Sequence, residues 1–377
     1  MQLQLESRGQ LVIGTIKESS MEIETILRRA IDCGASDIFV VAGLPLTFKV
    51  RGEQVRDEAA GKYTPQMTER FAQAVYQLAG REPHCVTGRE TDDDFSFSLS
   101  GIGRFRVNMF RQRGSIAAVV RVISFGLPTA EEAHIPPEVM QVANMKKGIV
   151  LVTGAAGSGK STTLACIINQ INHSRSGHIL TLEDPVEYIH RHGQCIISQR
   201  EIHIDCPSYV AALRSALRES PDVILLGEMR DRETMEVAMT AAETGQLLLS
   251  SLHTTGAANT IDRIIDAFPP NQQSQIRLQL SMVLQAVISQ QLVPGVDGQP
   301  IPAFEIMYTT MAIRNMIRES KTHLLESAIA SGGAMGMRTM DMALTELVTQ
   351  GKITKEAALT HCVNYETMKN RLGMTGM

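Results

Sequence analysis

Glycines and hydroxyl residues near the middle of the chain have the spacing of a phosphate-binding loop. Residues 154–161 read Gly-Ala-Ala-Gly-Ser-Gly-Lys-Ser, which fits the pattern G-x-x-x-x-G-K-[ST]. The apolar run 149–152 comes before it and predicts a buried parallel strand, while the sequence from Lys160 onward predicts a helix. A glycine-rich turn and a helix N-terminus both direct backbone N–H groups inward. The segment therefore predicts a cradle for the phosphates of a nucleotide.

Two side chains at the end of this loop have separate expected roles. Lys160 would reach the β- and γ-phosphates, and the Ser161 hydroxyl would coordinate Mg²⁺. The other positions expected to surround the phosphates are Gly154, Ala155, Ala156, Gly157, Ser158, Gly159 and Thr162. The alternative is a glycine-rich turn that fits the pattern by chance. The strand before it and the helix after it weigh against that alternative.

Acidic residues follow two further apolar runs. Glu183 comes directly after residues 179–182, and Glu228 follows residues 223–226 and one glycine. The carboxyl ends of parallel strands form the edge of a sheet where ligands bind. There, Glu183 could activate water beside a γ-phosphate, and Glu228 could hold Mg²⁺ directly or through water. The alternatives are an ordinary Glu-Asp-Pro turn for the first and a solvated strand end for the second.

Histidine and arginine side chains could also act on a bound nucleotide. His253 follows the apolar run 247–252, so it is either a γ-phosphate sensor or a packed, hydrogen-bonded histidine. Arginines are dense in one part of the N-terminal half, at Arg104, Arg106, Arg111 and Arg113. A solvated strand face would explain them. However, phosphoryl transfer needs positive charge on the moving phosphoryl group, and no other arginine cluster in the sequence is as dense.

Length, charge and cysteine content narrow the class of protein. The 377 residues favour two domains, and 36 basic against 40 acidic residues argue against a nucleic-acid-binding protein. Six cysteines without a C-x-x-C pair exclude a Cys₄ zinc module and suit a reducing cytosol. No run resembles a signal peptide or a membrane span. We expect a cytoplasmic protein that reaches the membrane only through a partner.

The N-terminal half predicts a small α+β domain with an antiparallel sheet. Residues 1–20 lack periodicity and are expected to form an extension. Apolar spacing and a Thr-Pro cap predict helices over 23–31 and 64–78. Alternating or apolar segments predict strands over 38–42, 46–50, 95–99, 105–109 and 116–123. The domain is expected to cover residues 21–125.

The C-terminal half predicts an α/β domain. Its strand-like and helical segments alternate, which indicates a parallel sheet with crossover helices. Prolines and glycines over 126–137 predict a linker, so this domain is expected over 138–377. From residue 271 onward, the sequence is expected to be mostly helical.

Longer stretches carry a family resemblance. They are GRFRVNMFRQRGS at 103–115, GAAGSGKSTT at 154–163, TLEDPVEYIH at 181–190, ALRSALRESPDVILLGEMRDRET at 212–234, LHTTGAANTIDRIIDAFP at 252–269 and AIRNMIRES at 312–320. Together they resemble the type II/IV secretion ATPases, and within them the PilT-like retraction ATPases of twitching motility, over about residues 21–373. The last four resemble the Asp-box, an atypical Walker B element, the His-box and a helix that marks retraction motors. The family usually has Pro-Thr where this chain has Ala155 and Ala156.

The resemblance implies a fold and a function. The implied fold is a PAS-like N-terminal domain followed by a RecA-like P-loop ATPase domain with a helical C-terminal region, assembled as a homo-hexamer. In the implied site Glu183 is catalytic, Glu228 is the Walker B acid near Mg²⁺, His253 senses the γ-phosphate, and arginines from 104–113 reach ATP. The implied activity is ATP hydrolysis that drives disassembly and retraction of a type IV pilus through an inner-membrane platform protein.

Three other functions compete with this interpretation. A pilus-assembly or type II secretion ATPase would share the fold, but the absence of a zinc module disfavours it. A non-hydrolysing accessory subunit would not need Glu183 and Glu228, and both are present. A P-loop kinase would need an acceptor pocket and a lid, and no segment predicts either.

Overall fold

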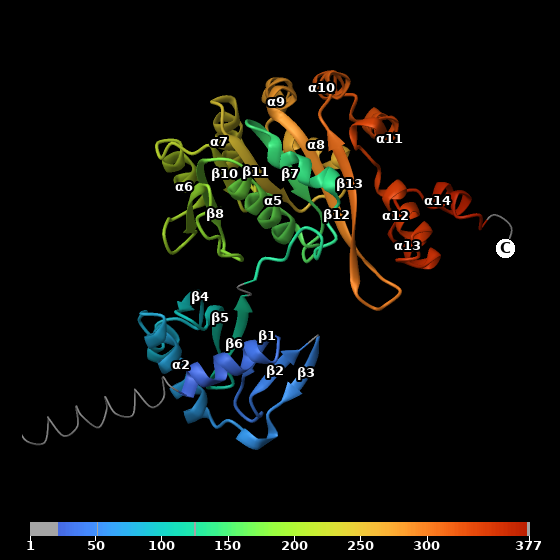
Figure 1. The fold of residues 1–377 in the computed structure, drawn as a ribbon. Helices are drawn as coiled ribbons and strands as arrows, with labels where there is room; N and C mark the ends of the chain where they lie inside the picture. Colours follow the sequence, from blue (N-terminus) through green and yellow to red (C-terminus); the bar gives the residue numbers. More distant parts are fainter. Residues whose placement is uncertain (1–21, 51, 124–125, 375–377) are drawn as a thin grey trace, which may run out of the picture. The chain divides into compact units, whose positions relative to one another are not determined.

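The chain divides into two compact units, each with a sheet of its own. A computed structural model describes residues 22–50, 52–123 and 126–374. The units are Met1–Gly126 and Leu127–Met377 (Figure 1). The predicted extension over 1–20 lies outside the described residues. The two sheets, with helices against them, make this an α/β protein.

The first unit contains a six-stranded antiparallel sheet in the order β3-β2-β1-β6-β5-β4. Its strands are β1 Ala35–Val40, β2 Thr47–Val50, β3 Glu53–Arg56, β4 Asp92–Leu99, β5 Gly103–Gln112 and β6 Ser115–Ile123. The predicted antiparallel sheet is present. The sequence missed β3, because all four of its residues are exposed and leave no apolar alternation.

Helices complete the core of the first unit. Residues 22–32 are helical, and α2 covers Pro65–Leu78. The Thr64 hydroxyl accepts a hydrogen bond from the Met67 N–H at 3.2 Å, so the predicted cap is formed. Both helices pack with the sheet in one apolar cluster. The short elements are η1 Glu58–Ala60 and α3 His84–Thr87.

The second unit is built on a seven-stranded sheet in the order β13-β12-β7-β11-β10-β8-β9. The predicted strands appear as β7 Gly148–Thr153, β8 Gly177–Glu183, β10 Val223–Leu226 and β11 Leu247–Leu252, with β9 Cys195–Glu201 at one edge. Neighbouring strands from β12 to β9 are parallel. The carboxyl ends of β7, β8, β10 and β11 therefore lie on one side of the sheet.

One part of this unit was not predicted. The segment after residue 271 contains several helices, as expected, but it also contains β12 Leu284–Pro294 and β13 Pro300–Tyr308, which pair as an antiparallel hairpin. Most residues of both strands are buried, so they show no alternation of apolar and polar side chains. A short apolar run of this kind cannot be told from a buried helix by periodicity.

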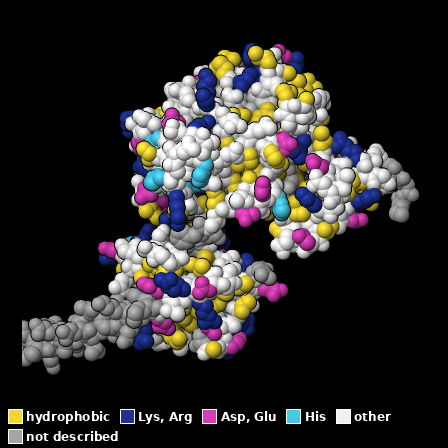
Figure 2. Space-filling view, viewed as in Figure 1, with side chains coloured by type: hydrophobic (Ala, Val, Ile, Leu, Met, Phe, Trp, Pro, Cys, Tyr) yellow, Lys and Arg dark blue, Asp and Glu magenta, His cyan; other side chains and the backbone are white. Residues whose placement is uncertain are grey.

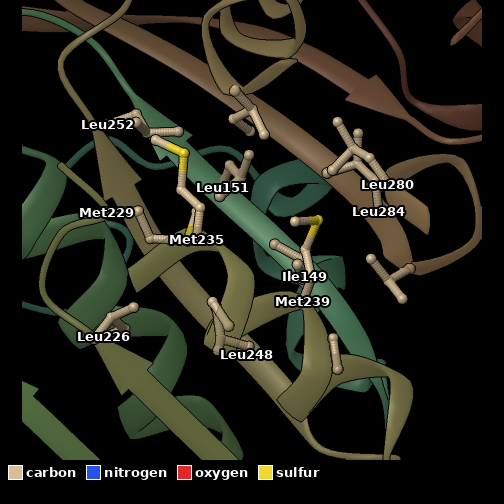
Figure 3. Close-up of a cluster of buried hydrophobic side chains, with 14 of the residues drawn as sticks. Ile149, Leu151, Leu226, Met229, Met235, Met239, Leu248, Leu252, Leu280 and Leu284 are labelled. Carbon is tan, nitrogen blue, oxygen red and sulfur yellow. The ribbon is translucent and has the colours of Figure 1, made fainter. Parts of the chain in front are cut away.

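Successive strand residues enter two cores, one on each face of the second sheet. Figure 3 shows Ile149 and Leu151 of β7 near Met235 and Met239 of α7. Val150 belongs to the other core, which includes helix α5. Burial on both faces explains why these strands are continuous apolar runs. The helices around the sheet are α5 Lys160–Ser174, α6 Tyr209–Ala216, α7 Arg232–Glu243, α8 Ala257–Asp266, α9 Pro270–Val283, α10 Met311–Arg318 and α11 Leu325–Ser331.

The last three helices form a smaller core with the hairpin. They are α12 Met340–Thr349, α13 Lys355–His361 and α14 Tyr365–Arg371, and they lie beside β12 and β13 in Figure 1. The remaining short elements are α4 Pro137–Met140, η2 Gln141–Asn144, η3 Thr322–Leu324 and η4 Gly333–Met335. Ile135, in the segment expected to be a linker, is 6% exposed and packs into the second unit.

Surface charge and helix length bear on two further expectations. On the face drawn in Figure 2, basic and acidic side chains are interspersed over the described residues of both units. Among the described residues, none of the helices has the length and apolar character needed to cross a bilayer.

Candidate active site

The glycine-rich loop connects β7 to α5. Lys160 is the first residue of α5, and Gly159 caps this helix in a left-handed conformation with φ 85°. Gly157 also has a positive φ, of 75°. At Gly154 a side chain has no space, because an added Cβ would lie 2.2 Å from the Gln290 carbonyl oxygen. The glycines of the motif are therefore required by backbone conformation and by close packing.

Lys160 lies at the centre of the predicted site. Its Nζ donates hydrogen bonds to the carbonyl oxygens of Gly154 at 3.0 Å and Ala155 at 2.9 Å. The same Nζ is 3.5 Å from His253 Nδ1. Burial lowers the pKa of Lys160, and the charges of Glu187 and Glu228 act in the opposite direction. An ammonium group held here is positioned for phosphate oxygens that enter the loop.

His253 connects Lys160 to the predicted Walker B acid. On the other side of the ring, His253 Nε2 is 3.5 Å from Glu228 Oε2, and Glu228 also pairs with Arg230 Nε at 2.6 Å. The His253 side chain is 49% exposed, whereas that of Glu228 is only 12% exposed. A histidine this exposed is not a packed core residue. The ends of β7, β10 and β11 thus bring a cation, an imidazole and a carboxylate together.

Glu183 ends β8 and has the chemistry of a general base. Burial raises its pKa to about 7, and a hydrogen bond from Gln199 acts in the opposite direction. The Gln199 Nε2 atom is 3.5 Å from Glu183 Oε1. The same Nε2 donates to the Tyr188 carbonyl at 2.8 Å, so the amide is fixed in place. A carboxyl group that titrates near neutral pH can take a proton from water under physiological conditions.

The structure adds neighbours of the loop to which the sequence analysis gave no role of their own. Glu187 Oε1 accepts a hydrogen bond from the Ser161 hydroxyl at 3.0 Å. The Tyr188 hydroxyl lies 2.8 Å from Thr162 Oγ1. Both neighbours stand in the stretch 181–190 that carried the family resemblance, but nothing in their spacing indicates contact with the loop. Gln290 of β12 also contacts the loop. The feature of the sequence that could have indicated this contact is a polar residue within a run of buried strand residues.

The oxygen atoms around Ser161 suit Mg²⁺. The Ser161 hydroxyl and the Glu187 carboxylate lie 3.0 Å apart, and both are hard oxygen ligands. In the part of the chain that the structure describes, no group of three or more His, Cys, Asp or Glu side chains could hold a metal by itself. Mg²⁺ in nucleotide sites is commonly bound by one or two protein groups together with phosphates and water. The residues present fit that kind of site.

The four arginines lie in the first unit, apart in the chain from the other predicted residues. Arg104 and Arg106 share one face of β5, as predicted. Arg106 forms a two-pronged ion pair with Asp94 at 3.0 and 2.7 Å, and Arg104 donates to the Ser98 hydroxyl at 3.3 Å. Arg111 donates to a backbone carbonyl at 3.1 Å, and Arg113 stands in a turn with φ 47°.

Comparison with known proteins identifies the family. Residues 18–356 match the family described as "Type II/IV secretion system protein". The chain is 44% identical over 339 residues to the "Type IV pilus retractation ATPase PilT" of Pseudomonas aeruginosa, which covers 90% of this chain and 97% of that protein. It is 49% identical over 306 residues to a "Twitching motility protein" of Neisseria gonorrhoeae, over 81% and 82% of the two chains.

A solved structure agrees with this assignment. The crystal structure of the "Pilus Retraction Motor PilT and Bound ADP" superposes with a TM-score of 0.85 at 42% identity, covering 92% of this chain and 99% of the other. The family match includes the glycine-rich loop, both acidic strand ends and His253. The chain therefore belongs to the type II/IV secretion system family, and within it to the PilT-like ATPases.

Proposed function

We propose that this ATPase powers disassembly and retraction of a type IV pilus. One observation supports an ATP-hydrolysing site above all others. Beside the glycine-rich loop, His253 lies within 3.5 Å of both Lys160 and Glu228. The relatives described as a pilus retraction ATPase and a twitching motility protein support retraction of the pilus rather than its assembly. The sequence contains no C-x-x-C pair, so it lacks the zinc module that would favour an assembly or secretion ATPase.

The proposed chemistry is direct hydrolysis of the terminal phosphate. The Lys160 ammonium binds the β- and γ-phosphates, and the loop N–H groups surround them. Glu183 accepts a proton as the water oxygen bonds to the γ-phosphorus, and the bond to the β–γ bridging oxygen breaks to give ADP and phosphate. His253 lies between Lys160 and Glu228, where it can sense the γ-phosphate.

The proposed Mg²⁺ site uses Ser161 and Glu228, with Glu187 beside Ser161. When bound, Mg²⁺ would neutralise phosphate charge. The Ser161 hydroxyl donates a hydrogen bond to Glu187 Oε1 at 3.0 Å, which fixes its oxygen in the first turn of α5. This contact keeps a hard oxygen donor at the position where the motif requires one.

We further propose a homo-hexamer that acts at the inner face of the cytoplasmic membrane. Arginines of the first unit would complete the site, and Arg104 is the first choice, followed by Arg106, Arg111 and Arg113. The apolar side of β5 at Phe105, Val107 and Met109 is buried, which fixes the direction of the Arg104 side chain and supports this choice. The proposed partner is the pilus platform protein in that membrane, and motion between the two units would be passed to it.

Two measurements test this function. ATPase activity should rise steeply with protein concentration over the range in which the particle mass changes from one chain to six. In cells, loss of the protein should leave more pili on the surface and abolish twitching, because assembled fibres are no longer withdrawn. Cells without surface pili would instead indicate an assembly ATPase. Unchanged pili and unchanged twitching would refute a role in this machine.

A further inference from the structure

Strand β12 carries three consecutive polar residues within a buried, mainly apolar strand. They are Ser289, Gln290 and Gln291, and each of the first two is 2% exposed. A buried amide or hydroxyl is costly unless it is hydrogen-bonded. Their partners therefore show what the strand does in this position.

The side-chain amide of Gln290 contacts both the nucleotide loop and helix α5. Its Oε1 accepts a hydrogen bond from the Thr163 hydroxyl at 2.7 Å, and its Nε2 donates to the Ser158 carbonyl oxygen. The backbone oxygen of Gln290 also fills the space beside Gly154. Gln290 thus contacts the loop at Gly154 and Ser158, and it contacts helix α5 at Thr163.

Ser289 contacts the segment that follows His253. Its hydroxyl accepts a hydrogen bond from the Gly256 N–H at 2.8 Å. Ser289 is paired across the hairpin with Glu305, whose Oε1 accepts from the Ala257 N–H at 2.7 Å. These are the first N–H groups of α8, which have no partner inside the helix. The hairpin therefore fixes the start of α8, whose N-cap Gly256 lies three residues after His253.

We propose that Gln290 and Ser289 are positioning residues with separate effects on the two halves of the reaction. Gln290 sets the shape of the phosphate-binding loop and so acts on ATP binding. Ser289 sets the turn that carries His253 and so acts on hydrolysis. Each side chain acts through the protein groups that it contacts. This inference rests on the ATP site proposed above. It adds that the β12–β13 hairpin holds the loop and His253 in their positions.

Four variants test the division, with Gln291→Met as the matched control. Gln291 is the next residue of the same strand, but its amide donates to the His361 carbonyl at 2.9 Å and has no contact with the loop. Gln290→Met removes both contacts with the loop. Gln290→Glu keeps the shape and the acceptor for Thr163, but it places a carboxylate oxygen against the Ser158 carbonyl. Ser289→Ala removes only the acceptor for Gly256.

The full-length chain is measured for the Kd of ATP, kcat, KM and thermal midpoint. Loss of one or two neutral hydrogen bonds predicts a rise in Kd of about three- to tenfold for Gln290→Met, and more for Gln290→Glu. Ser289→Ala should lower kcat about three- to tenfold and leave Kd unchanged. The control should leave Kd and kcat as in the wild-type protein.

A structural role alone makes a different prediction. In that case the Gln290 variants would lower the thermal midpoint and the active fraction but leave Kd and KM where the control has them, which overturns the proposal. If Gln290→Met fails to fold, Thr163→Val removes the same hydrogen bond from the other partner and must then raise Kd. Lys160→Ala is measured in parallel. Hydrolysis that survives Lys160→Ala would refute the ATP site itself, whatever Gln290 does.

Discussion

Replacing Glu183 by glutamine should stabilise the protein while stopping hydrolysis. The carboxyl group lies at the end of β8, where burial raises its pKa from 4.5 to about 7. Glutamine has nearly the same shape but never ionises. The variant therefore removes the energetic penalty of a buried charge, and with it the proposed general base. Residues that are strained or poorly solvated for function commonly show this trade between stability and activity.

The expected stabilisation depends on pH. Below pH 4.5 the carboxyl is protonated in the folded and the unfolded chain, so the substitution has no effect through charge. As pH rises from 4.5 to 7, the unfolded chain releases the proton while the folded chain retains it, and the wild-type protein loses stability relative to the variant. The difference is below ~1 kcal/mol at pH 5 and reaches about 3 kcal/mol at pH 8.

Thermal unfolding without nucleotide, at fixed protein concentration, measures this difference. For a unit of this size, about 3 kcal/mol corresponds to a rise in the thermal midpoint of roughly 6–12 °C at pH 8. Asp184→Asn is the control, because the exposed neighbour has no burial penalty to lose. An equal difference between Glu183→Gln and wild type at pH 5 and pH 8 would refute the argument, as would normal ATPase activity in the variant.

Three further predictions use other parts of the site. The value of kcat/KM should rise with pH through a midpoint near 7. Gln199→Met should move this midpoint upward, because the Gln199 amide lowers the pKa of Glu183. A midpoint that Gln199→Met leaves unchanged would mean that another group titrates. Arg318 is exposed at the end of α10, so Arg318→Ala should spare ATPase activity and spoil retraction in cells, whereas equal loss of both would indicate a folding role. Mixing inactive Glu183→Ala with inactive Arg104→Ala should restore activity if Arg104 serves a neighbouring subunit; no recovery despite proven subunit exchange would exclude Arg104, since an arginine on the γ-phosphate is typically worth about 10³–10⁵ in rate.

Local signals explain what the sequence could predict. The loop over 154–161 is encoded by spacing alone, because positive φ values and close packing demand glycine at fixed positions. The parallel strands could be predicted because burial on both faces leaves unbroken apolar runs. Residues at the carboxyl ends of parallel strands lie at one edge of the sheet. The sequence therefore predicted the positions of Glu183, Glu228 and His253 at that edge.

Contacts between distant segments were not predictable in the same way. Glu187 reaches Ser161 across 26 positions of sequence, and Tyr188 reaches Thr162 across the same separation. Which side chain of an acidic turn faces the loop depends on the path of the backbone after β8. No periodicity records that path. The family resemblance indicated that this stretch matters, but it did not indicate which atoms meet.

The error at β12 and the omission of Gln290 have one cause. Within a helix, consecutive Ser289, Gln290 and Gln291 would point in different directions, and those that reach the surface would be hydrogen-bonded by solvent. Within a strand buried on both faces, the same residues must find partners inside the protein. Those partners are the nucleotide loop, the start of α8 and the end of α13. Correct assignment of the strand thus makes Ser289 and Gln290 candidates for function, because a buried polar side chain must find a partner inside the protein, and theirs lie beside the nucleotide loop and the start of α8.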